Sequence, residues 1–373
     1  MAKTSTAVKT LNYIRQEATP QYQSVVPKAT ASNIKEIGNI LLNDAYQPML
    51  NEFINNLINR IALTRIESKA YTNPLAMFKK GSIAYGVDVQ LIYENPAEAE
   101  AYEYSNEAMA KLLTITDPDT KVAYLRRNRK DLYTKTISRE GLQGAFVDEP
   151  SFERFIDSIT QSLYNGNYID ELDYTKALID GAYEEGKVIT EVVSAVSDKA
   201  TAEALVEKCR ALYLKMQFPS TKYNAYSKFT DLGSEKPVKT WTESDRICVI
   251  TTADIMAKVD VQSLASAFNL DKADFIGRLV VIDEFENEEI QALICDESFL
   301  QIYDNIFRFD EFYNARTMTW NEYLHAWSTF AISPFANAVC LATKLPDTET
   351  ETETETETET ETETETETDT EQI

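Results

Sequence analysis

The chain has 373 residues, a formal net charge of −25 and a single histidine, His325. That length is enough for two domains or for one elaborate domain with a sizeable core. So acidic a chain argues against a protein that binds bare nucleic acid, because phosphate contacts need a basic footprint. Ten glycines are also few for phosphate-cradling loops.

The cysteines and the apolar segments indicate a protein made in a reducing compartment. Cys209, Cys248, Cys295 and Cys340 are far apart and form no CxxC motif, so we expect buried free thiols. The N-terminus lacks an apolar stretch of signal-peptide length, and the most apolar stretch, 330–342, is too short to span a bilayer. We therefore expect synthesis in the cytoplasm and no membrane partner.

The first sixty residues combine a polar arm with helical segments. Residues 1–30 show little periodicity, and we expect them to be ordered only by contact with something else. Asn33 and Glu36 fit a capping box at the start of a helix that Pro48 interrupts. Apolar residues at steps of three and four then predict a second helix with a core-facing stripe. The stripe consists of Leu50, Phe53, Ile54, Leu57, Ile58 and Ile61.

Two extended segments follow, separated by an acidic stretch. Alternation over residues 83–89 predicts a strand that Asn95-Pro96 closes, and residues 122–137 predict another. Residues 96–111, between them, are acidic and alanine-rich and fit a short helix or a mobile tip. The two strands would form a long hairpin, which buries too little of its own surface to be stable alone in water. We therefore expect it to pack against a partner sheet, a partner chain or both.

Paired amphipathic helices are predicted next. Glu149-Pro150 opens the first helix with proline in its first turn, and Asn165-Gly166-Asn167 ends it. The second helix runs to Glu185 and stops at Gly186, and a strand at 188–196 follows. Helices of this length could serve as a backbone for the fold.

Residues 197–316 predict a compact α+β unit. Its three apolar strands are RICVITT, GRLVVIDEF and IQALICDE, and we expect the last two to flank a hairpin loop at 286–289. Its other elements are a helix capped by Ser197 or Asp198, a long irregular loop at 218–242 and a helical piece at 263–268.

Two segments close the chain. Residues 320–343 are apolar on both faces, so we place them in the middle of a sheet beside the paired helices. The compact unit would then be inserted within another domain. Residues 347–373 contain thirteen acids and no base, mostly as a Thr-Glu repeat, and leave a net charge of −12 for residues 1–346. With nothing apolar to bury, this tail is expected to be disordered.

No arrangement of residues indicates catalysis. His325 lies in an apolar, tryptophan-flanked stretch, where we expect a satisfied core residue rather than a catalytic base. One acidic cluster could hold a hard cation, but a solvated turn is the simpler interpretation. That cluster consists of Asp283, Glu284, Glu286, Glu288 and Glu289. We therefore expect no catalytic, cofactor-binding or metal-binding residues.

Basic residues gather on the two predicted arms of the hairpin. In so acidic a chain, a second copy of the chain suits them better than nucleic acid does. Arginine–carboxylate pairs across such a contact would set its register. The alternative is a solvated strand face with local salt bridges. The candidate intersubunit residues are Lys79, Lys80, Arg126, Arg127, Arg129 and Lys130.

Six stretches follow one another in a recognisable order: KATASNIKEIGNILL, NPLAMFKKGSIAYG, RRNRKDLYTKTI, LASAFNLDKADFIGRLVVID, IYDNIF and WNEYLHAWSTFAISPFANAV. Together they resemble the major capsid proteins of small short-tailed (podovirus) phages of the phi-29-like group. No single stretch is a strong motif, and the collinear order over residues 20–343 makes the match specific. The resemblance implies an α+β capsid fold of the Hong Kong 97 (HK-97) type.

The resemblance also implies a domain layout. It consists of an N-terminal arm (1–61), an extended E-loop lying over the neighbouring subunit (62–141), a peripheral (P) domain (142–196 and 317–346) with a spine helix at about 150–165, an inserted axial (A) domain (197–316) and the disordered tail (347–373). Relatives in this group can carry an immunoglobulin-like domain beyond the capsid fold, whereas only Thr-Glu repeats follow here. We expect this tail to point outward, because inside it would crowd acids against packaged DNA.

The implied function is that of a head protein. It would self-assemble through homo-pentamers and homo-hexamers into an icosahedral shell that encloses double-stranded DNA in the virion, after synthesis in the host bacterial cytoplasm. A scaffolding protein and a portal or connector are further implied partners, and the DNA would be held without sequence specificity. The alternatives are an encapsulin-like compartment and a carboxylate-dependent hydrolase.

Overall fold

A computed structural model describes residues 6–63, 71–84, 86–99, 118–229, 237–259 and 278–347. The contacts group the chain into two units. Unit 1 comprises residues 1–73, 128–172 and 304–328, and unit 2 comprises residues 74–127, 173–303 and 329–373. The predicted helical piece at 263–268 and the Thr-Glu repeat from residue 348 lie outside the described residues.

Unit 1 begins with a set of helices that pack on their own chain. They are α1 (Thr6–Glu17), α2 (Pro20–Val25), α3 (Ile34–Leu41) and α4 (Gln47–Leu63). On α1, Ala7, Leu11 and Ile14 are buried in the core of unit 1, and the backbone N–H of Ala7 donates to Glu153 Oε1 at 3.1 Å. Residues 6–30 thus pack on other segments of the same chain, in agreement with the expected need for a contact, but the helices α1 and α2 were not predicted. The apolar positions follow helical spacing, which the polar average composition hid.

The boundaries of α3 and α4 differ from the prediction in two details. Asn33 is the N-cap of α3, but its side chain caps no N–H of this helix, so the predicted capping box with Glu36 does not form. Pro48 lies in the first turn of α4 instead of interrupting a helix, which suits a residue without a backbone N–H. Four residues of the predicted stripe are buried, and the side chains of the other two lie outside the described residues. The buried four are Leu50, Phe53, Ile54 and Leu57.

Gly38 on α3 lies against the buried ring of Phe146. A Cβ added at Gly38 would lie 2.3 Å from Phe146 Cβ, which neither residue can accept without moving. We expect Gly38→Ala to lower the free energy of unfolding by about 1–3 kcal/mol, the usual range for overpacking a core. Urea denaturation measures this loss. Gly144→Ala is the control, because no atom lies within 4 Å of its added Cβ, and it should leave the midpoint unchanged or slightly higher. Equal midpoints for the two variants would refute the close approach.

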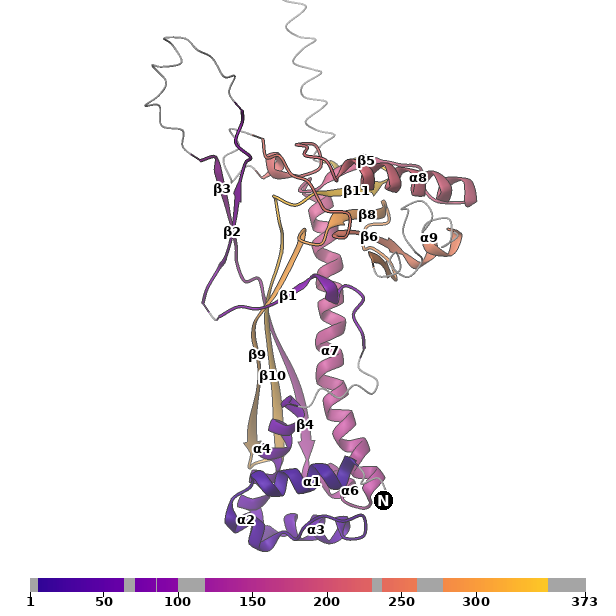
Figure 1. Cartoon of the computed structure of the whole chain (residues 1–373). Coiled ribbons are helices and arrows are strands. Elements are labelled where there is room, and N and C mark those ends of the chain that lie inside the picture. Colours follow the sequence, from indigo (N-terminus) through magenta and orange to yellow (C-terminus); the bar gives the residue numbers. More distant parts are fainter. Residues whose placement is uncertain are drawn as a thin grey trace, which may run out of the picture. The chain divides into compact units, whose positions relative to one another are not determined.

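One four-stranded sheet has the strand order β1-β9-β10-β4. Its strands are β1 (Lys79–Ser82), β9 (Leu300–Asn314), β10 (Thr319–Ile332) and β4 (Arg129–Ser138). Figure 1 shows β9, β10 and β4 side by side, and β10 pairs antiparallel with β4 from Thr319↔Ser138 to Ser328↔Arg129. The central place predicted for the segment that begins at Trp320 is thus confirmed for β10.

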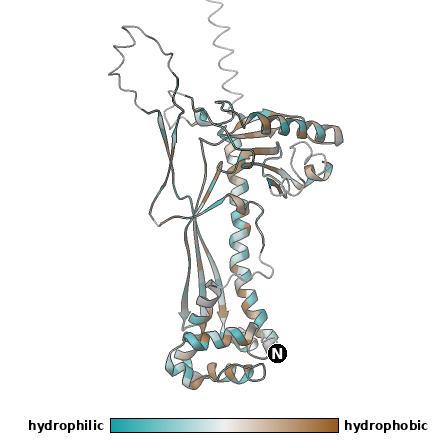
Figure 2. Ribbon diagram, viewed as in Figure 1, coloured by the Kyte–Doolittle hydropathy of each residue, from teal (hydrophilic) through white to brown (hydrophobic). Residues whose placement is uncertain are grey.

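The predicted pair of helices is one helix. α7 runs without interruption through all 36 residues from Glu149 to Glu184, so the expected end at 165–167 is wrong. Its start at Glu149 and its stop before Gly186, which has a φ of +64°, are as predicted. Figure 2 shows hydrophilic residues along much of α7, and the polar Asn-Gly-Asn stretch continues this pattern without breaking the helix.

The hairpin in unit 2 is shorter than predicted. β2 (Val89–Glu94) pairs antiparallel with β3 (Thr120–Leu125), from Val89↔Leu125 to Glu94↔Thr120. The alternating residues 83–89 instead lie between β1 and β2 and share only Val89 with β2. The predicted second arm divides into β3 and β4 with a break at 126–128. Within the predicted acidic stretch, residues 100–111 lie outside the described residues.

A five-stranded sheet forms the rest of unit 2. Its order is β5-β11-β8-β6-β7, so β6 separates β7 from β8 and the hairpin predicted between them is wrong. All three predicted apolar strands are present. The elements are β5 (Ile189–Val192), α8 (Lys199–Lys215), β6 (Ile247–Thr252), α9 (Ala253–Lys258), β7 (Leu279–Ile282), β8 (Ile290–Asp296) and β11 (Ala338–Ala342).

The structure confirms two local features that the sequence predicted in unit 2. Asp198 caps α8 in a capping box with Thr201, as one of the two predicted caps. The four cysteines are free and buried.

The five-stranded sheet also takes β5 and β11 from outside residues 197–316, because β11 pairs with both β5 and β8. Within the residues that the structure describes, no helix combines the length and apolar character needed to cross a membrane.

Candidate assembly surfaces

The six candidate intersubunit residues lie in different environments. Lys80 Nζ pairs with Glu297 Oε1 at 3.1 Å in unit 2. Arg126 keeps 83% of its side chain exposed, with Asp88 Oδ2 3.6 Å from its Nε. Lys130 is exposed and places Nζ 5.8 Å from the ring centroid of Trp327. Lys79 and Arg127 are half-buried. The role of these residues between subunits stays a prediction.

Arg129 differs from the others because only 4% of it is exposed. Its Nε donates to Asp131 Oδ2 at 2.6 Å, and its Nη2 donates to the Tyr133 hydroxyl at 2.6 Å and to Asn167 Oδ1 at 3.1 Å. The Tyr133 hydroxyl in turn donates to Asp170 Oδ2 at 2.5 Å. Arg129 therefore joins β4 to α7 inside unit 1, at the place where the sequence predicted a helix end.

The Asn-Gly-Asn stretch of α7 receives these contacts. Asn165 Oδ1 accepts from the backbone N–H of Tyr71 at 3.0 Å, and a Cβ added at Gly166 would touch the Tyr133 ring at 3.4 Å. Asn167 is buried beside Arg129. The polar side chains of Asn165 and Asn167 bind neighbouring segments of unit 1. They do not mark the end of a helix, because α7 continues through them.

One face of the β2–β3 hairpin packs on unit 2. Leu91 and Tyr93 contact a small core of Ala123, Tyr226, Val238 and Phe335. The Tyr93 ring stacks on Phe335 with centroids 5.6 Å apart, and its hydroxyl donates to the carbonyl of Lys239. This inner face is thus covered by the same chain, which is one of the outcomes that the sequence left open.

Asn95 closes the same end of the hairpin. Its Nδ2 donates to Asp119 Oδ2 at 2.7 Å and to the carbonyl of Pro237 at 3.2 Å. Its Oδ1 accepts from the backbone N–H of Lys239 at 3.0 Å. Asn95 therefore satisfies backbone groups of a loop that the sequence marked only as irregular, and no sequence signal identified these contacts.

Among the described residues of unit 2, no such core covers the opposite face of the hairpin. Strand alternation places Gln90, Ile92, Val122 and Tyr124 on it, and the register pairs Ile92 with Val122 and Gln90 with Tyr124. Ile92 and Tyr124 are each 63% exposed. We call these four residues the outer hairpin face. An exposed aliphatic and aromatic strand face of this kind is typical of a protein–protein contact.

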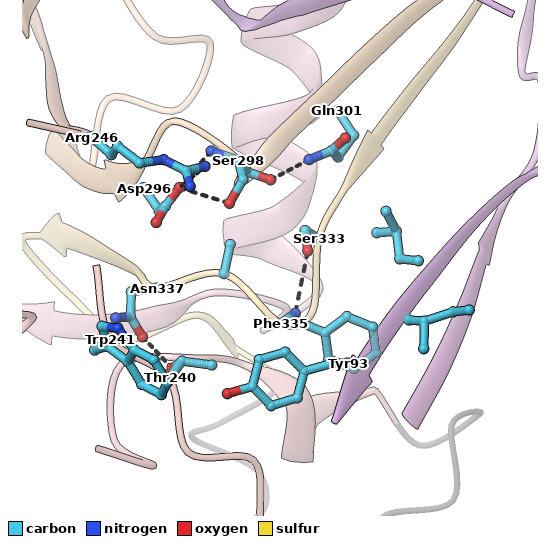
Figure 3. A pocket seen from close by; sticks show the side chains of 13 residues that line it. Tyr93, Thr240, Trp241, Arg246, Asp296, Ser298, Gln301, Ser333, Phe335 and Asn337 are labelled. Carbon is cyan, nitrogen blue, oxygen red and sulfur yellow. Dashed lines mark hydrogen bonds and ion pairs between the residues drawn. The ribbon is translucent and has the colours of Figure 1, made fainter. Parts of the chain in front are cut away.

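A pocket of about 290 Å³ lies beside the hairpin in unit 2. Figure 3 shows the rings of Tyr93 and Phe335 on one side and Arg246, Asp296 and Ser298 on the other. Arg246 Nη2 lies 3.4 Å from Asp296 Oδ1, which also accepts from the Ser298 hydroxyl at 2.7 Å. The charged groups of the pocket are thus paired with each other.

The sheet of unit 1 also has a partly apolar exposed face. Leu132 on β4 pairs with His325 on β10, and Lys130 pairs with Trp327. His325 Nε2 lies 3.5 Å from Asp310 Oδ2, so the prediction of a satisfied histidine holds, although it is half-buried rather than in the core. Alternation places the exposed Phe312 on the same face as Asp310. We call this the outer sheet face.

The described residues contain no group of three or more His, Cys, Asp or Glu side chains that could hold a metal ion. In the acidic cluster that the sequence analysis considered at residues 283–289, Asp283 Oδ1 pairs with Lys176 Nζ at 3.1 Å, and the backbone N–H of Glu286 donates to Asp180 Oδ2 at 2.9 Å. A local partner therefore accounts for the Asp283 carboxylate, and the backbone of Glu286 is also held locally. The prominent features of both units are exposed contact faces, which suit a protein that associates with other chains.

Comparison with known proteins places this architecture. A chain from the capsid structure of Staphylococcus phage Andhra superposes with a TM-score of 0.62 at 15% identity, covering 75% of this chain and 87% of that one. A chain from a structure of the head fiber and inner core protein of native bacteriophage P68 gives 0.57 at 14% identity, with the same coverage. The fold is that of a phage capsid protein of the HK-97 type.

Sequence similarity gives the family. The Phi29-like phage major capsid protein family matches residues 11–342. The major capsid protein of Bacillus phage B103 is 34% identical over 337 residues, covering 89% of this chain and 72% of that protein. The major capsid protein of Streptococcus phage Cp-1 is 26% identical over 343 residues, covering 88% and 92%. The chain therefore belongs to the Phi29-like phage major capsid protein family, whose members are shell-forming proteins of the virion.

Proposed function

We propose that this chain builds an icosahedral head from homo-pentamers and homo-hexamers and that the head encloses double-stranded DNA. Residues 1–61 act as the N-terminal arm, 62–141 as the E-loop, 142–196 with 317–346 as the P domain, and 197–316 as the A domain. The rings need head-to-tail contacts, in which one surface of a subunit meets a different surface of the next. Many such contacts close a shell that is stable even when each contact is weak.

The observation that carries this proposal is the outer hairpin face. Its inner side is already packed on unit 2, so the hairpin is held out with Ile92 and Tyr124 exposed. In the proposed contact, this face lies on a neighbouring copy. The outer sheet face, with Leu132 and Phe312 exposed, offers apolar area for the other half of a head-to-tail contact.

Basic residues near the hairpin set the register of the same contact. Arg126 has weak support within its own chain, because the separation from Asp88 is long and both side chains are well exposed. We expect Arg126→Glu to reduce particle formation at least tenfold, without changing the free energy of unfolding by more than about 1 kcal/mol. Arg129 is left out, since its reversal would break a buried network. Sedimentation measures the assembled fraction. A variant that assembles with the wild-type yield would show that Arg126 is not part of the contact.

The partners of the shell follow from the same proposal. A scaffolding protein and a portal or connector assist assembly, the DNA is held without sequence specificity, and the subunit has no catalytic activity. The test is electron microscopy of particles from the full chain made in infected cells, with nucleic acid and protein contents measured on the same fraction. Closed heads containing double-stranded DNA support the proposal. Small soluble oligomers favour the hydrolase alternative, and shells filled with a foreign protein favour the compartment.

A further inference from the structure

Glu322 is a buried acid whose surroundings do not stabilise a negative charge. It lies on β10 between Trp320 and Leu324 of the same face, and its exposed fraction is 0%. Both of its carboxylate oxygens are buried without a hydrogen-bond partner in the described part of the chain. An ionised carboxylate in such a place loses its hydration and gains nothing in return.

The groups around Glu322 do not supply the missing partner. Glu311 on β9 is a second half-buried acid, which accepts a hydrogen bond from the Asn55 side chain of α4 and leaves Oε2 without one. Lys135 on β4 is the Cα partner of Glu322, yet its ammonium group does not reach either carboxylate oxygen of Glu322. On the same face of β4, the Tyr133 hydroxyl is already bonded to Asp170 of α7. Asn51 of α4, which accepts from Trp320, carries no charge.

We propose that Glu322 is a proton-binding site that keeps the unit 1 sheet closed, and that ionisation of Glu322 under alkaline conditions loosens the β9–β10–β4 sheet. The neutral acid needs no counter-ion and can be buried between Trp320 and Leu324. The charged form must find water or a cation, which it can reach only if the strands move. The sheet therefore has two states that differ by one proton.

The electrostatics agree with this geometry. Burial, with a smaller contribution from Glu311, raises the pKa of Glu322 to about 8. A free glutamate in the unfolded chain titrates near pH 4.3. The folded state therefore binds the extra proton, so stability falls as the pH rises from the unfolded pKa and levels off above about pH 8. Burial also raises the pKa of Asp180, to about 6, which confines the effect of Asp180 to lower pH.

The test is urea unfolding of the unassembled full chain at pH 6, 7 and 8. For the wild type, the folding equilibrium constant should fall roughly fiftyfold between pH 6 and pH 8, as expected for one acid with a folded pKa of about 8. Glu322→Gln removes the proton site and should remove this dependence. Glu140→Gln, at an exposed position of the same unit, should keep the wild-type dependence.

Further variants keep the result decisive. If Glu322→Gln fails to fold, Glu322→Leu replaces it, because leucine fills the apolar site without any polar group. Lys135→Met should also keep the wild-type dependence, since the proposal gives Lys135 no ion pair with Glu322. A wild-type chain without pH dependence over this range, or a Glu322 variant that retains it, would overturn the proposal. A Lys135→Met variant with a pH dependence that the wild type lacks would also overturn the proposal. Glu322 would then be ionised and paired with Lys135 in the native chain.

Discussion

Replacing Ile92 and Tyr124 together by glutamate is expected to abolish particle formation and to leave a folded subunit. Both side chains are 63% exposed on the outer hairpin face, so their replacement should cost the folded subunit little stability. In the shell, burial of two such side chains contributes about 3 kcal/mol or more per contact, roughly a hundredfold in each association constant. The loss is repeated at every contact of the shell. Sedimentation and negative-stain microscopy measure assembly, and urea unfolding checks the fold.

Leu214→Glu with Val192→Glu is the matched control. Both residues are exposed apolar side chains of unit 2, and neither lies on the hairpin. We expect this control to assemble at least tenfold better than the hairpin variant. If both variants fail to assemble, the effect is one of added charge and not of the hairpin. If the hairpin variant forms normal heads, the outer hairpin face is not an assembly contact.

Arg129→Ala is expected to lower the free energy of unfolding by about 3–5 kcal/mol, the usual cost of removing one member of a buried charge pair. The truncation leaves Asp131 without its charged donor and removes a hydrogen bond from both Tyr133 and Asn167. Because these bonds join β4 to α7, the loss should reduce the yield of folded subunit before it affects assembly. Urea denaturation of the unassembled chain gives the value.

Arg308→Ala provides the comparison. Arg308 and Asp310 on β9 have the same spacing as Arg129 and Asp131, and Arg308 Nη2 lies 2.6 Å from Asp310 Oδ1. Here 72% of the arginine side chain is exposed, so we expect a loss below about 1 kcal/mol. Similar losses for the two variants would mean that burial does not determine the importance of Arg129.

Local signals were the reliable part of the sequence prediction. The cap at Asp198, the start of α7 at Glu149 and the three apolar strands of unit 2 all depend on residues close to one another in the chain. The misplaced helix end at 165–167 has a tertiary cause. Asn165 and Asn167 bind Tyr71 and Arg129, which lie far away in sequence, and no local pattern distinguishes such contacts from a helix stop.

The hairpin shows how far the assembly surface could be predicted. Alternation placed aliphatic and aromatic side chains on a two-faced strand and indicated that it needs a partner. It could not show that Tyr93 stacks on Phe335 while Ile92 stays exposed, because the two faces are equally apolar in sequence. Similarly, six basic residues looked alike, but Arg129 is buried among partners of its own chain and Arg126 is exposed.

A cryo-electron microscopy map of assembled heads tests the central claim most directly. The outer hairpin face is predicted to be buried by a neighbouring copy, with Ile92 and Tyr124 in contact with residues of that subunit, while Tyr93 keeps its stack on Phe335 within its own chain. A map in which Ile92 and Tyr124 face solvent, or are covered by their own subunit, would contradict the account.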